Sequence, residues 1–309
     1  LYNSIALLER GEWKIIARKI ILPTYEVFDE KRYFRSEEKV SVLTKEIHNK
    51  TWRIGFTICE DLWVNKNIEG RGIHKENPIS DLKKKKVDIL VNLSASPYTF
   101  KKLELRSKVS SFAAQYLQVP LIYVNQIGAN DNLIFDGNSF ILDKNGSKIK
   151  QLKSFSEDLS SWHIEQTIPE KKEFEQSEIS SIFDALVLGV RDYAQKCGFK
   201  TALIGLSGGI DSALVSAIAT AALGSNNIYC VSMPSKWSSS HSKSDAKDLA
   251  RRLKINFNSI PIENLMNSFE ESFIKTISFE MAEITNQNIQ SRIRGTLLMA
   301  LANQEKHLL

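Results

Sequence analysis

Short apolar runs with alternating polar positions dominate the chain before residue 159 and predict strands. The expected strands are Trp13–Ile20, Thr51–Ile58, Asp88–Leu93, Leu121–Asn125, Asn138–Leu142 and Ser147–Lys150. The last two flank Asn145-Gly146, a strong signal for a tight hairpin. Residues Leu103–Leu117 have helical spacing instead, and Pro120 follows them. This mixture of strands and helices predicts a layered α/β domain.

The second half of the chain alternates more regularly between strands and helices. The expected helices are Ile179–Cys197, one that ends at Leu223, and one around Ser244–Leu253. The expected strands, each of which follows one of these helices, are Thr201–Leu206, Ile228–Met233 and Asn256–Ile262. A β-α-β-α-β order predicts a parallel sheet that binds ligands at the carboxyl ends of its strands.

A polar segment separates the strand-rich first part of the chain from the second part, in which strands and helices alternate. It contains Pro169 and the charged run Glu170–Glu173, with few apolar residues. We therefore expect domains at 1–165 and 178–309, joined by a linker at 166–177.

Composition narrows the class of protein. Of the 309 residues, 42% are apolar and 25% are charged, which is typical of a soluble globular protein. The net charge of +5 is too small to indicate a nucleic-acid surface, and Lys83–Lys86 are interpreted as a solvated face. Three cysteines exclude a disulfide scaffold, and the apolar stretch Ala213–Leu223 is too short to span a bilayer. We therefore expect a cytoplasmic protein without nucleic-acid or membrane partners.

One cysteine stands where a strand is expected to end. The alternating segment Thr51–Ile58 is followed by Cys59-Glu60-Asp61. A thiol at this position can project into a cleft, where a nearby cation lowers its pKa and favours attack on an amide carbonyl. The alternative is a buried cysteine that packs as a small hydrophobic residue.

A second candidate site lies between a predicted strand and a predicted helix, at Ser207-Gly208-Gly209-Ile210-Asp211-Ser212. Two glycines permit close approach of the backbone to a ligand, and a helix N-terminus directs N–H groups at an anion. The segment is neither a Walker loop nor a dinucleotide fingerprint. Asp211 could hold Mg²⁺ or cap the helix, and the alternative is a plain strand-turn-helix corner.

The first region resembles the nitrilase/amidase superfamily, in the form found in glutamine-dependent NAD synthetases. The resemblance rests on Gly55-Phe56-Thr57-Ile58-Cys59-Glu60-Asp61-Leu62-Trp63, Lys19-Ile20-Ile21-Leu22-Pro23-Thr24-Tyr25 with Phe28–Phe34, Asn92-Leu93-Ser94-Ala95-Ser96-Pro97-Tyr98, and Asn125-Gln126-Ile127-Gly128. It implies a nitrilase-like α-β-β-α sandwich. It also implies that Cys59 is the nucleophile, that Lys19 stabilises the oxyanion, and that Tyr25, Ser96 and Lys102 bind glutamine. Without the resemblance, Lys19 would be a surface lysine and the other three ordinary loop residues.

The second region is similar to ATP pyrophosphatases, which cleave ATP between its α- and β-phosphates. The resemblance implies a Rossmann-like adenine-nucleotide alpha-hydrolase fold with Mg²⁺ on Asp211. The implied ATP-binding residues are Gly205, Leu206, Ser207, Gly208, Gly209, Ile210, Asp211 and Ser212. The segments Val231–Ser235, Ser238–Ser242 and Asn288–Thr296 resemble NAD synthetases, so Asn288 and Arg292 are expected to contact deamido-NAD. Arg292 and Arg294 would otherwise be solvated helix charges.

Two family segments are expected to be missing. The general-base glutamate of the nitrilase family lies well before the lysine motif, but only 18 residues precede Lys19 and none resembles its motif. A Thr-Gly-Asn-Lys-Ser-Glu type segment should follow soon after the position of His307, and it is absent. The residues therefore correspond to the central part of the family's length.

Together, the two resemblances imply ATP-dependent amidation of deamido-NAD with ammonia released from glutamine. An acyl adenylate is the expected intermediate, and a homo-oligomer is the expected assembly. Two alternatives remain open at this point. One is another ATP-pyrophosphatase amidotransferase, making GMP or asparagine, and the other is an inactive fragment that binds nucleotide without turnover.

Overall fold

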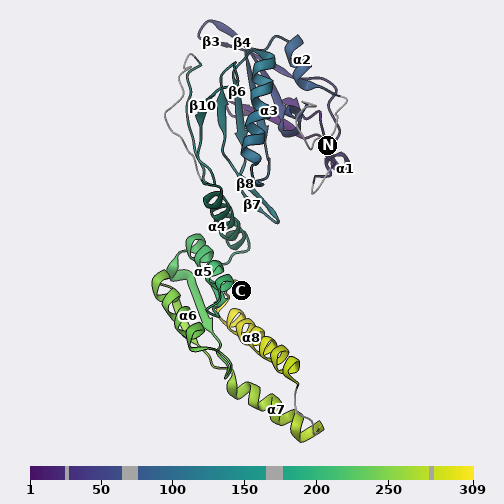
Figure 1. Cartoon of the computed structure of the whole chain (residues 1–309). Helices are drawn as coiled ribbons and strands as arrows, with labels where there is room; N and C mark the ends of the chain where they lie inside the picture. Colours follow the sequence, from purple (N-terminus) through teal and green to yellow (C-terminus); the bar gives the residue numbers. More distant parts are fainter. Residues whose placement is uncertain (25–27, 65–75, 165–176, 278–281) are drawn as a thin grey trace. The chain divides into compact units, whose positions relative to one another are not determined.

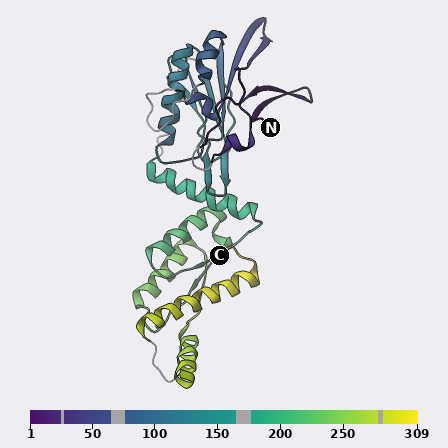
Figure 2. The same cartoon turned by 90° about the vertical axis from the view of Figure 1, so that its right-hand side faces the viewer.

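The computed structural model describes residues 1–24, 28–64, 76–164, 177–277 and 282–309. The chain forms two compact units, Leu1–Ile182 and Phe183–Leu309. Figures 1 and 2 show both units. All but one residue of the predicted linker 166–177 lies outside the described residues.

A six-stranded mixed sheet forms the centre of the first unit. Across the sheet, its strands are β10 (Lys148–Gln151), β9 (Phe140–Leu142), β6 (Leu121–Asn125), β5 (Ile89–Ser94), β4 (Lys50–Ile58) and β3 (Val42–Ile47). The three central strands β4, β5 and β6 are parallel, and β3, β9 and β10 pair antiparallel to their neighbours. The predicted α/β class is therefore confirmed.

Two helices, α2 (Pro78–Lys84) and α3 (Lys102–Leu117), cover one face of this sheet (Figure 1). Their apolar side chains form one core cluster with residues of β5, β6 and β9, including Leu82, Leu90 and Tyr123. The hairpin of β1 (Ser4–Glu9) and β2 (Glu12–Arg18) packs elsewhere, against Ile58 at the end of β4. The remaining elements are α1 (Glu30–Tyr33), the 3₁₀ turn η1 (Cys59–Leu62), β7 (Ile127–Asn130) and β8 (Leu133–Asp136).

The second unit contains the parallel sheet that the sequence predicts. Its strands are β11 (Ala202–Gly205), β12 (Ile228–Ser232) and β13 (Asn256–Ser259), in that order. Its helices are α4 (Glu178–Lys196), which begins in the first unit, α5 (Ile210–Leu223), α6 (Ser240–Leu253), α7 (Glu263–Ile277) and α8 (Glu283–Glu305), and a short turn, η2 (Ser225–Asn227), precedes β12.

Helices pack on both faces of this second sheet. Ile228 and Cys230 of β12 join a cluster with α5 and α6, whereas Val231 joins a cluster with α7 and α8. Successive side chains of β12 thus point to opposite helical layers, as expected for a buried parallel strand. Among the described helices, none combines the length and the apolar composition that crossing a membrane requires.

Candidate active sites

The end of β4 places Cys59 in a strained backbone conformation. Ile58 closes the strand, and Cys59 opens η1 with a φ of +46°, in the left-handed region that favours glycine. Such conformations persist where the surrounding structure holds them, and they cluster at functional sites. The predicted position of Cys59 at a strand end is therefore what the structure shows.

Asp61 ties this strand end to the segment that follows Lys19. Its Oδ1 accepts hydrogen bonds from the backbone N–H groups of Ile20 (3.1 Å) and Ile21 (2.7 Å). Its Oδ2 accepts from Ile58 N–H at 3.0 Å. Burial raises the pKa of Asp61 to about 6, although these three N–H groups act in the opposite direction. A single buried carboxyl group thus fixes two segments of the site that lie far apart in the sequence.

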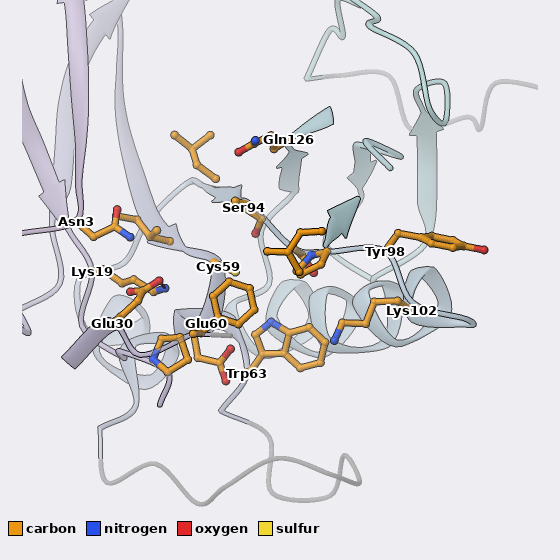
Figure 3. A pocket seen from close by; sticks show the side chains of 18 of the residues that line it. Asn3, Lys19, Glu30, Cys59, Glu60, Trp63, Ser94, Tyr98, Lys102 and Gln126 are labelled. Atoms are coloured by element: carbon orange, nitrogen blue, oxygen red, sulfur yellow. Dashed lines mark hydrogen bonds and ion pairs between the residues drawn. The ribbon is translucent and has the colours of Figure 1, made fainter. Parts of the chain in front are cut away.

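Lys19 is a buried cation beside the thiol. Its side chain is 2% exposed, and its Nζ lies 2.7 Å from Oε1 of Glu30. Both side chains line the same cavity as Cys59 (Figure 3). Sequence reasoning did not single out Glu30, although it lies within the lysine motif and a buried ammonium needs a counter-charge.

The surroundings of the Cys59 thiol oppose its ionisation on balance. Burial raises its pKa, and the carboxylates of Glu60 and Glu30 act in the same direction. The Lys19 ammonium and a hydrogen bond with Ser94 lower it. Attack by this sulfur therefore requires that its proton be removed as the substrate arrives.

A cavity of about 450 Å³ surrounds the thiol and includes two of the three expected glutamine ligands. Ser96 and Lys102 both line it, and the Lys102 ammonium lies 5.3 Å from the centre of the Trp63 ring. The third expected ligand, Tyr25, lies outside the described residues. Figure 3 shows Trp63 and Lys102 along one side of this space.

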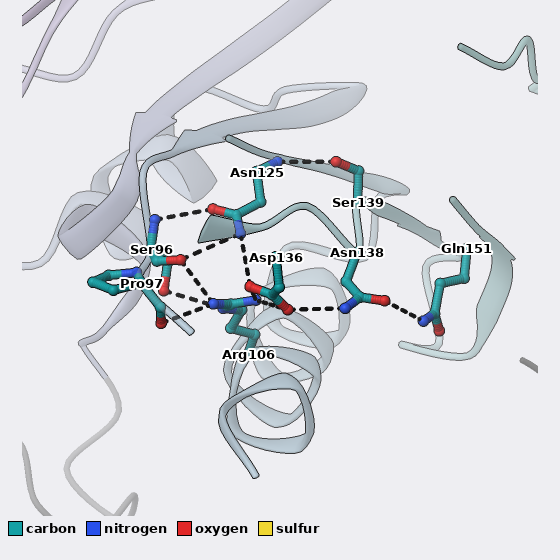
Figure 4. Close-up of polar contacts among 8 residues, drawn as sticks. All are labelled: Ser96, Pro97, Arg106, Asn125, Asp136, Asn138, Ser139 and Gln151. Atoms are coloured by element: carbon teal, nitrogen blue, oxygen red, sulfur yellow. Dashed lines mark hydrogen bonds and ion pairs between the residues drawn. The ribbon is translucent and has the colours of Figure 1, made fainter. Parts of the chain in front are cut away.

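A buried arginine fixes the loop that carries Ser96 (Figure 4). Arg106 is 0% exposed, and its Nη1 binds both oxygens of Asp136, at 2.7 and 3.0 Å. Its Nε donates to Ser96 Oγ at 3.1 Å, and its Nη2 donates to the carbonyls of Ser96 (2.8 Å) and Pro97 (3.0 Å). Asn125 completes the frame by accepting from Ser96 N–H at 2.9 Å. Every N–H of the guanidinium is thereby bonded.

The second candidate site is the loop between β11 and α5. Ser207 and Ser212 lie with their hydroxyl oxygens 3.1 Å apart, and Ser207 Oγ accepts from Gly209 N–H at 3.2 Å. Gly208 has a φ of +86°, and a Cβ there would lie 2.2 Å from the carbonyl oxygen of Ser242. Only glycine fits this position, because the loop passes so close to the start of α6.

A cavity of about 180 Å³ adjoins this loop and has a cationic lining. Gly205 and Ser207 line it together with Lys243 and Arg294. Arg294 donates from Nε to the carbonyl of Met233 at 3.1 Å, which anchors it beside the loop. Two cations next to a helix N-terminus suit a polyphosphate.

The other residues expected to bind ATP differ in how exposed their side chains are. Asp211 is exposed in the first turn of α5, and Ile210 is 80% exposed. Leu206 is 1% exposed within the core, so only its backbone could meet a ligand. Among the described residues, no group of three or more His, Cys, Asp and Glu side chains is placed to hold a metal.

Asn288 and Arg292 lie apart from this cavity. They are exposed on one face of α8, where they line an open groove with Ser291, Gly295 and Thr296. The structure therefore brings Arg294, and not Arg292, next to Ser207. Two positions apart on a helix, the two arginine side chains point in different directions. The motif contains both arginines, so it did not show which of them would lie beside the loop.

A thiol at a strand end, a buried lysine and a carboxylate thus lie in one cavity, and these are the residue types that thiol-dependent hydrolysis of carbon–nitrogen bonds uses. The chain belongs to the carbon–nitrogen hydrolase family, whose family model matches residues 1–172. The NAD synthase family model matches residues 182–309.

Relatives that share one name match all or nearly all of the chain. A glutamine-dependent NAD(+) synthetase of Synechocystis is 45% identical over 314 aligned residues, covering 100% of this chain and 56% of its own length. One from Acinetobacter baylyi is 38% identical and is covered over 54% of its length. The solved glutamine-dependent NAD+ synthetase of Acinetobacter baumannii, in complex with ADP, superposes with a TM-score of 0.84 at 36% identity. That match covers 98% of this chain and 56% of the solved one, so the chain spans about half the length of these relatives.

Proposed function

We propose that the chain carries the two reaction centres of a glutamine-dependent NAD synthetase. One centre, in 1–165, releases ammonia from glutamine, and the other, in 178–309, uses ATP to couple ammonia to deamido-NAD. The observation that carries the proposal is the presence, on one chain, of a thiol–lysine–carboxylate cavity and of a glycine–serine loop lined by cations. The curated relatives' names and the two matched family models support it.

In the first centre, Cys59 attacks the side-chain carbonyl of glutamine, forming a thioester and releasing ammonia. Negative charge develops on the carbonyl oxygen, and the Lys19 ammonium, fixed at 2.7 Å by Glu30, stabilises it. Fixing the ammonium beforehand matters because it then need not reorganise when the charge appears. Water hydrolyses the thioester to glutamate in the second half of the cycle.

The glutamine itself is proposed to lie between the thiol and the Ser96–Lys102 side of the cavity. Arg106 donates to Ser96 Oγ, so the hydroxyl hydrogen of Ser96 can be donated to an acceptor. A substrate carboxylate is such an acceptor, and the ammonium of Lys102 supplies the matching charge. Tyr25 is proposed as a third ligand on the resemblance alone.

In the second centre, the loop Gly205–Ser212 is proposed to bind the pyrophosphate part of ATP, with Lys243 and Arg294 beside it. The deamido-NAD carboxylate attacks the α-phosphorus, pyrophosphate leaves, and ammonia then displaces AMP from the acyl adenylate. Asp211 fits Mg²⁺ as a single carboxylate ligand, since this ion commonly completes its shell with substrate phosphates and water. Bound there, Mg²⁺ would neutralise phosphate charge. Asn288 and Arg292 are proposed contacts for deamido-NAD.

Two assays on the wild-type chain and two variants test this proposal. Ammonia release from glutamine is expected to disappear in Cys59→Ala, whereas exchange of labelled pyrophosphate into ATP, dependent on deamido-NAD, persists. Asp211→Ala is expected to show the reverse pattern. Loss of both activities in Cys59→Ala would contradict a separate glutaminase centre, and retained exchange in Asp211→Ala would remove its metal role.

The acceptor substrate is decided by the same exchange assay. Xanthosine monophosphate and aspartate are compared with deamido-NAD, because amidotransferases for GMP and asparagine share the ATP loop. Exchange with either compound alone would replace the proposal by that rival, and exchange with none would indicate a nucleotide-binding fragment. The proposed homo-oligomer is checked separately by light scattering.

A further inference from the structure

Three polar side chains form a buried row across the central strands. The parallel register pairs Thr57 of β4 with Asn92 of β5, and Asn92 with Tyr123 of β6. All three are at most 1% exposed, and Asn92 Nδ2 donates to Thr57 Oγ1 at 3.0 Å. Polar residues at three successive positions of a buried row are unusual, because each must find a hydrogen bond.

Ser94 connects this row to the nucleophile. It lies two residues after Asn92 and therefore on the same face of β5, and its hydroxyl donates to Asn92 Oδ1 at 2.6 Å. The register also pairs Ile58 with Leu93, so Cys59 and Ser94 follow at adjacent strand ends. Both line the cavity, where Ser94 lies next to the sulfur (Figure 3).

The Tyr123 hydroxyl has no hydrogen-bond partner among the described residues, although it is buried. Its ring is held in place by stacking on Phe140, with 4.8 Å between the ring centres. Burial raises the pKa of Tyr123 to about 12, while the hydroxyls of Ser94 and Ser96 act in the opposite direction from close by. An unpaired buried hydroxyl costs stability that phenylalanine, of nearly the same shape, would not cost. A functional use of this hydroxyl would account for its presence.

We propose that Tyr123 is a positioning residue that stabilises the Cys59 thiolate through Ser94. While the thiol is neutral, the Ser94 hydrogen points to Asn92. When the sulfur becomes charged, the Ser94 hydrogen rotates to the sulfur, and the Tyr123 hydroxyl donates to Ser94 Oγ. No proton is transferred by this pair of hydrogen bonds. The inference rests on the proposed role of Cys59 as nucleophile.

Charged groups around the two hydroxyls set the background for a pH measurement. Lys19 favours the thiolate, and Glu60 and Glu30 oppose it. On the side of Tyr123, the Cys59 sulfur raises the pKa of the tyrosine, and Arg106, which is paired with Asp136, lowers it. None of these groups is changed by replacing Tyr123 or Ser94, so a shift in the thiol's titration reports on the hydroxyls.

The test is the pH profile of Cys59 alkylation by iodoacetamide, with the labelled peptide identified by mass spectrometry to separate it from Cys197 and Cys230. Tyr123→Phe is expected to move the profile up by about one pH unit, so alkylation below the midpoint slows about tenfold. Ser94→Ala is expected to shift the profile in the same direction, and the double variant no further than Ser94→Ala. Tyr116→Phe, at a tyrosine that is 38% exposed on α3, is the matched control and leaves the profile unchanged.

Three results would overturn the inference. The first is a Tyr123→Phe profile that coincides with that of the wild type. The second is a double variant whose shift is the sum of the single shifts. The third is a shift accompanied by unfolding at lower denaturant concentration, which would indicate general loosening of the site. Glutamine hydrolysis is measured separately, so loss of the proposed function with an intact alkylation shift would leave this inference standing.

Discussion

Glu30 and Lys19 form an ion pair of 2.7 Å in which the lysine is almost completely buried. The pair lines the cavity wall next to Cys59, and among the residues that the structure describes, Oε2 of the carboxylate is buried without a hydrogen bond. A buried ammonium is stable only with such a partner, because desolvation otherwise favours its neutral form. Glu30 therefore supplies the counter-charge of the buried lysine and fixes its position.

Glu30→Gln is expected to lower the kcat of glutamine hydrolysis by about tenfold or more, because the amide no longer holds the Lys19 charge in place. Steady-state ammonia release measures this effect. Glu37→Gln is the matched control, since Glu37 pairs with Arg18 at 3.2 Å on the surface. Equal kcat values for wild type and Glu30→Gln would show that the ion pair is only structural.

Asp61 predicts an unusual pH dependence of stability. Its folded pKa of about 6 exceeds the ordinary value of 3.8, so between these pH values the folded state keeps a proton that the unfolded state has lost. The free energy of unfolding therefore falls as pH rises from about 4 to about 6, by about 3 kcal/mol for this group. Above pH 6 the contribution is constant.

Asp61→Asn isolates this contribution. The amide cannot titrate, and its NH₂ would face the Ile58 N–H that Oδ2 now accepts, so the variant is about 1–3 kcal/mol less stable. Urea unfolding measured across pH 4–7 should show the stability difference between wild type and variant shrinking as pH rises. Asp81→Asn, at an exposed carboxyl group, should retain the wild-type slope. A difference that does not vary with pH would contradict the prediction.

Arg106 and Asp136 are expected to depend on each other for stability. Arg106→Met leaves a buried carboxylate without its counter-charge, which costs about 3–5 kcal/mol of unfolding free energy. Adding Asp136→Asn removes that charge and should recover part of the loss. Arg252→Met, which breaks an exposed pair with Asp248, should change stability by less than about 0.5 kcal/mol. Denaturant unfolding of the wild type, Arg106→Met, Asp136→Asn, the double variant and Arg252→Met measures these differences. A double variant whose loss equals the sum of the two single losses would contradict the coupling.

Gly208→Ala tests the close approach of the loop to α6. The new Cβ would meet the Ser242 carbonyl oxygen at 2.2 Å, so the loop must move and ATP binding should be lost. Gly198→Ala is the control, because Gly198 has a similar φ of +79° but open space around it. The control should lose only about 1 kcal/mol of stability and bind ATP normally. Calorimetric ATP titration decides the matter, and normal binding by Gly208→Ala would exclude a close-packed loop.

The longer elements of the fold could be predicted because their patterns are local. The predicted strand Leu121–Asn125 coincides with β6, and the helix Leu103–Leu117 matches α3 to within one residue. The short strands β7 and β8 were not predicted, since four residues give too little alternation to recognise. Helix α6 begins at Ser240, earlier than expected, because Ser239 caps it by accepting from Ser242 N–H at 3.0 Å.

The candidate sites were predictable only where a motif carried them. Motif resemblance indicated Lys19 and Cys59, and the structure places both at one cavity. Arg106 was not foreseen, because a charged residue in a predicted helix is normally assigned to the solvated face. Its burial depends on Asp136, thirty positions further along, and no local pattern reports such a pairing.

The in-register pairing of Thr57, Asn92 and Tyr123 limits how the length of this chain can change. One residue inserted into β5 before Asn92 would exchange its two faces, turning Asn92 and Ser94 away from α3 and directing Leu93 inward. The hydroxyl beside the sulfur would then be replaced by hydrocarbon, with no substitution at any of these positions. Insertions and deletions of residues are therefore tolerable in the connecting loops. A one-residue shift of register within the central strands, in contrast, would separate the nucleophile from its polar neighbours.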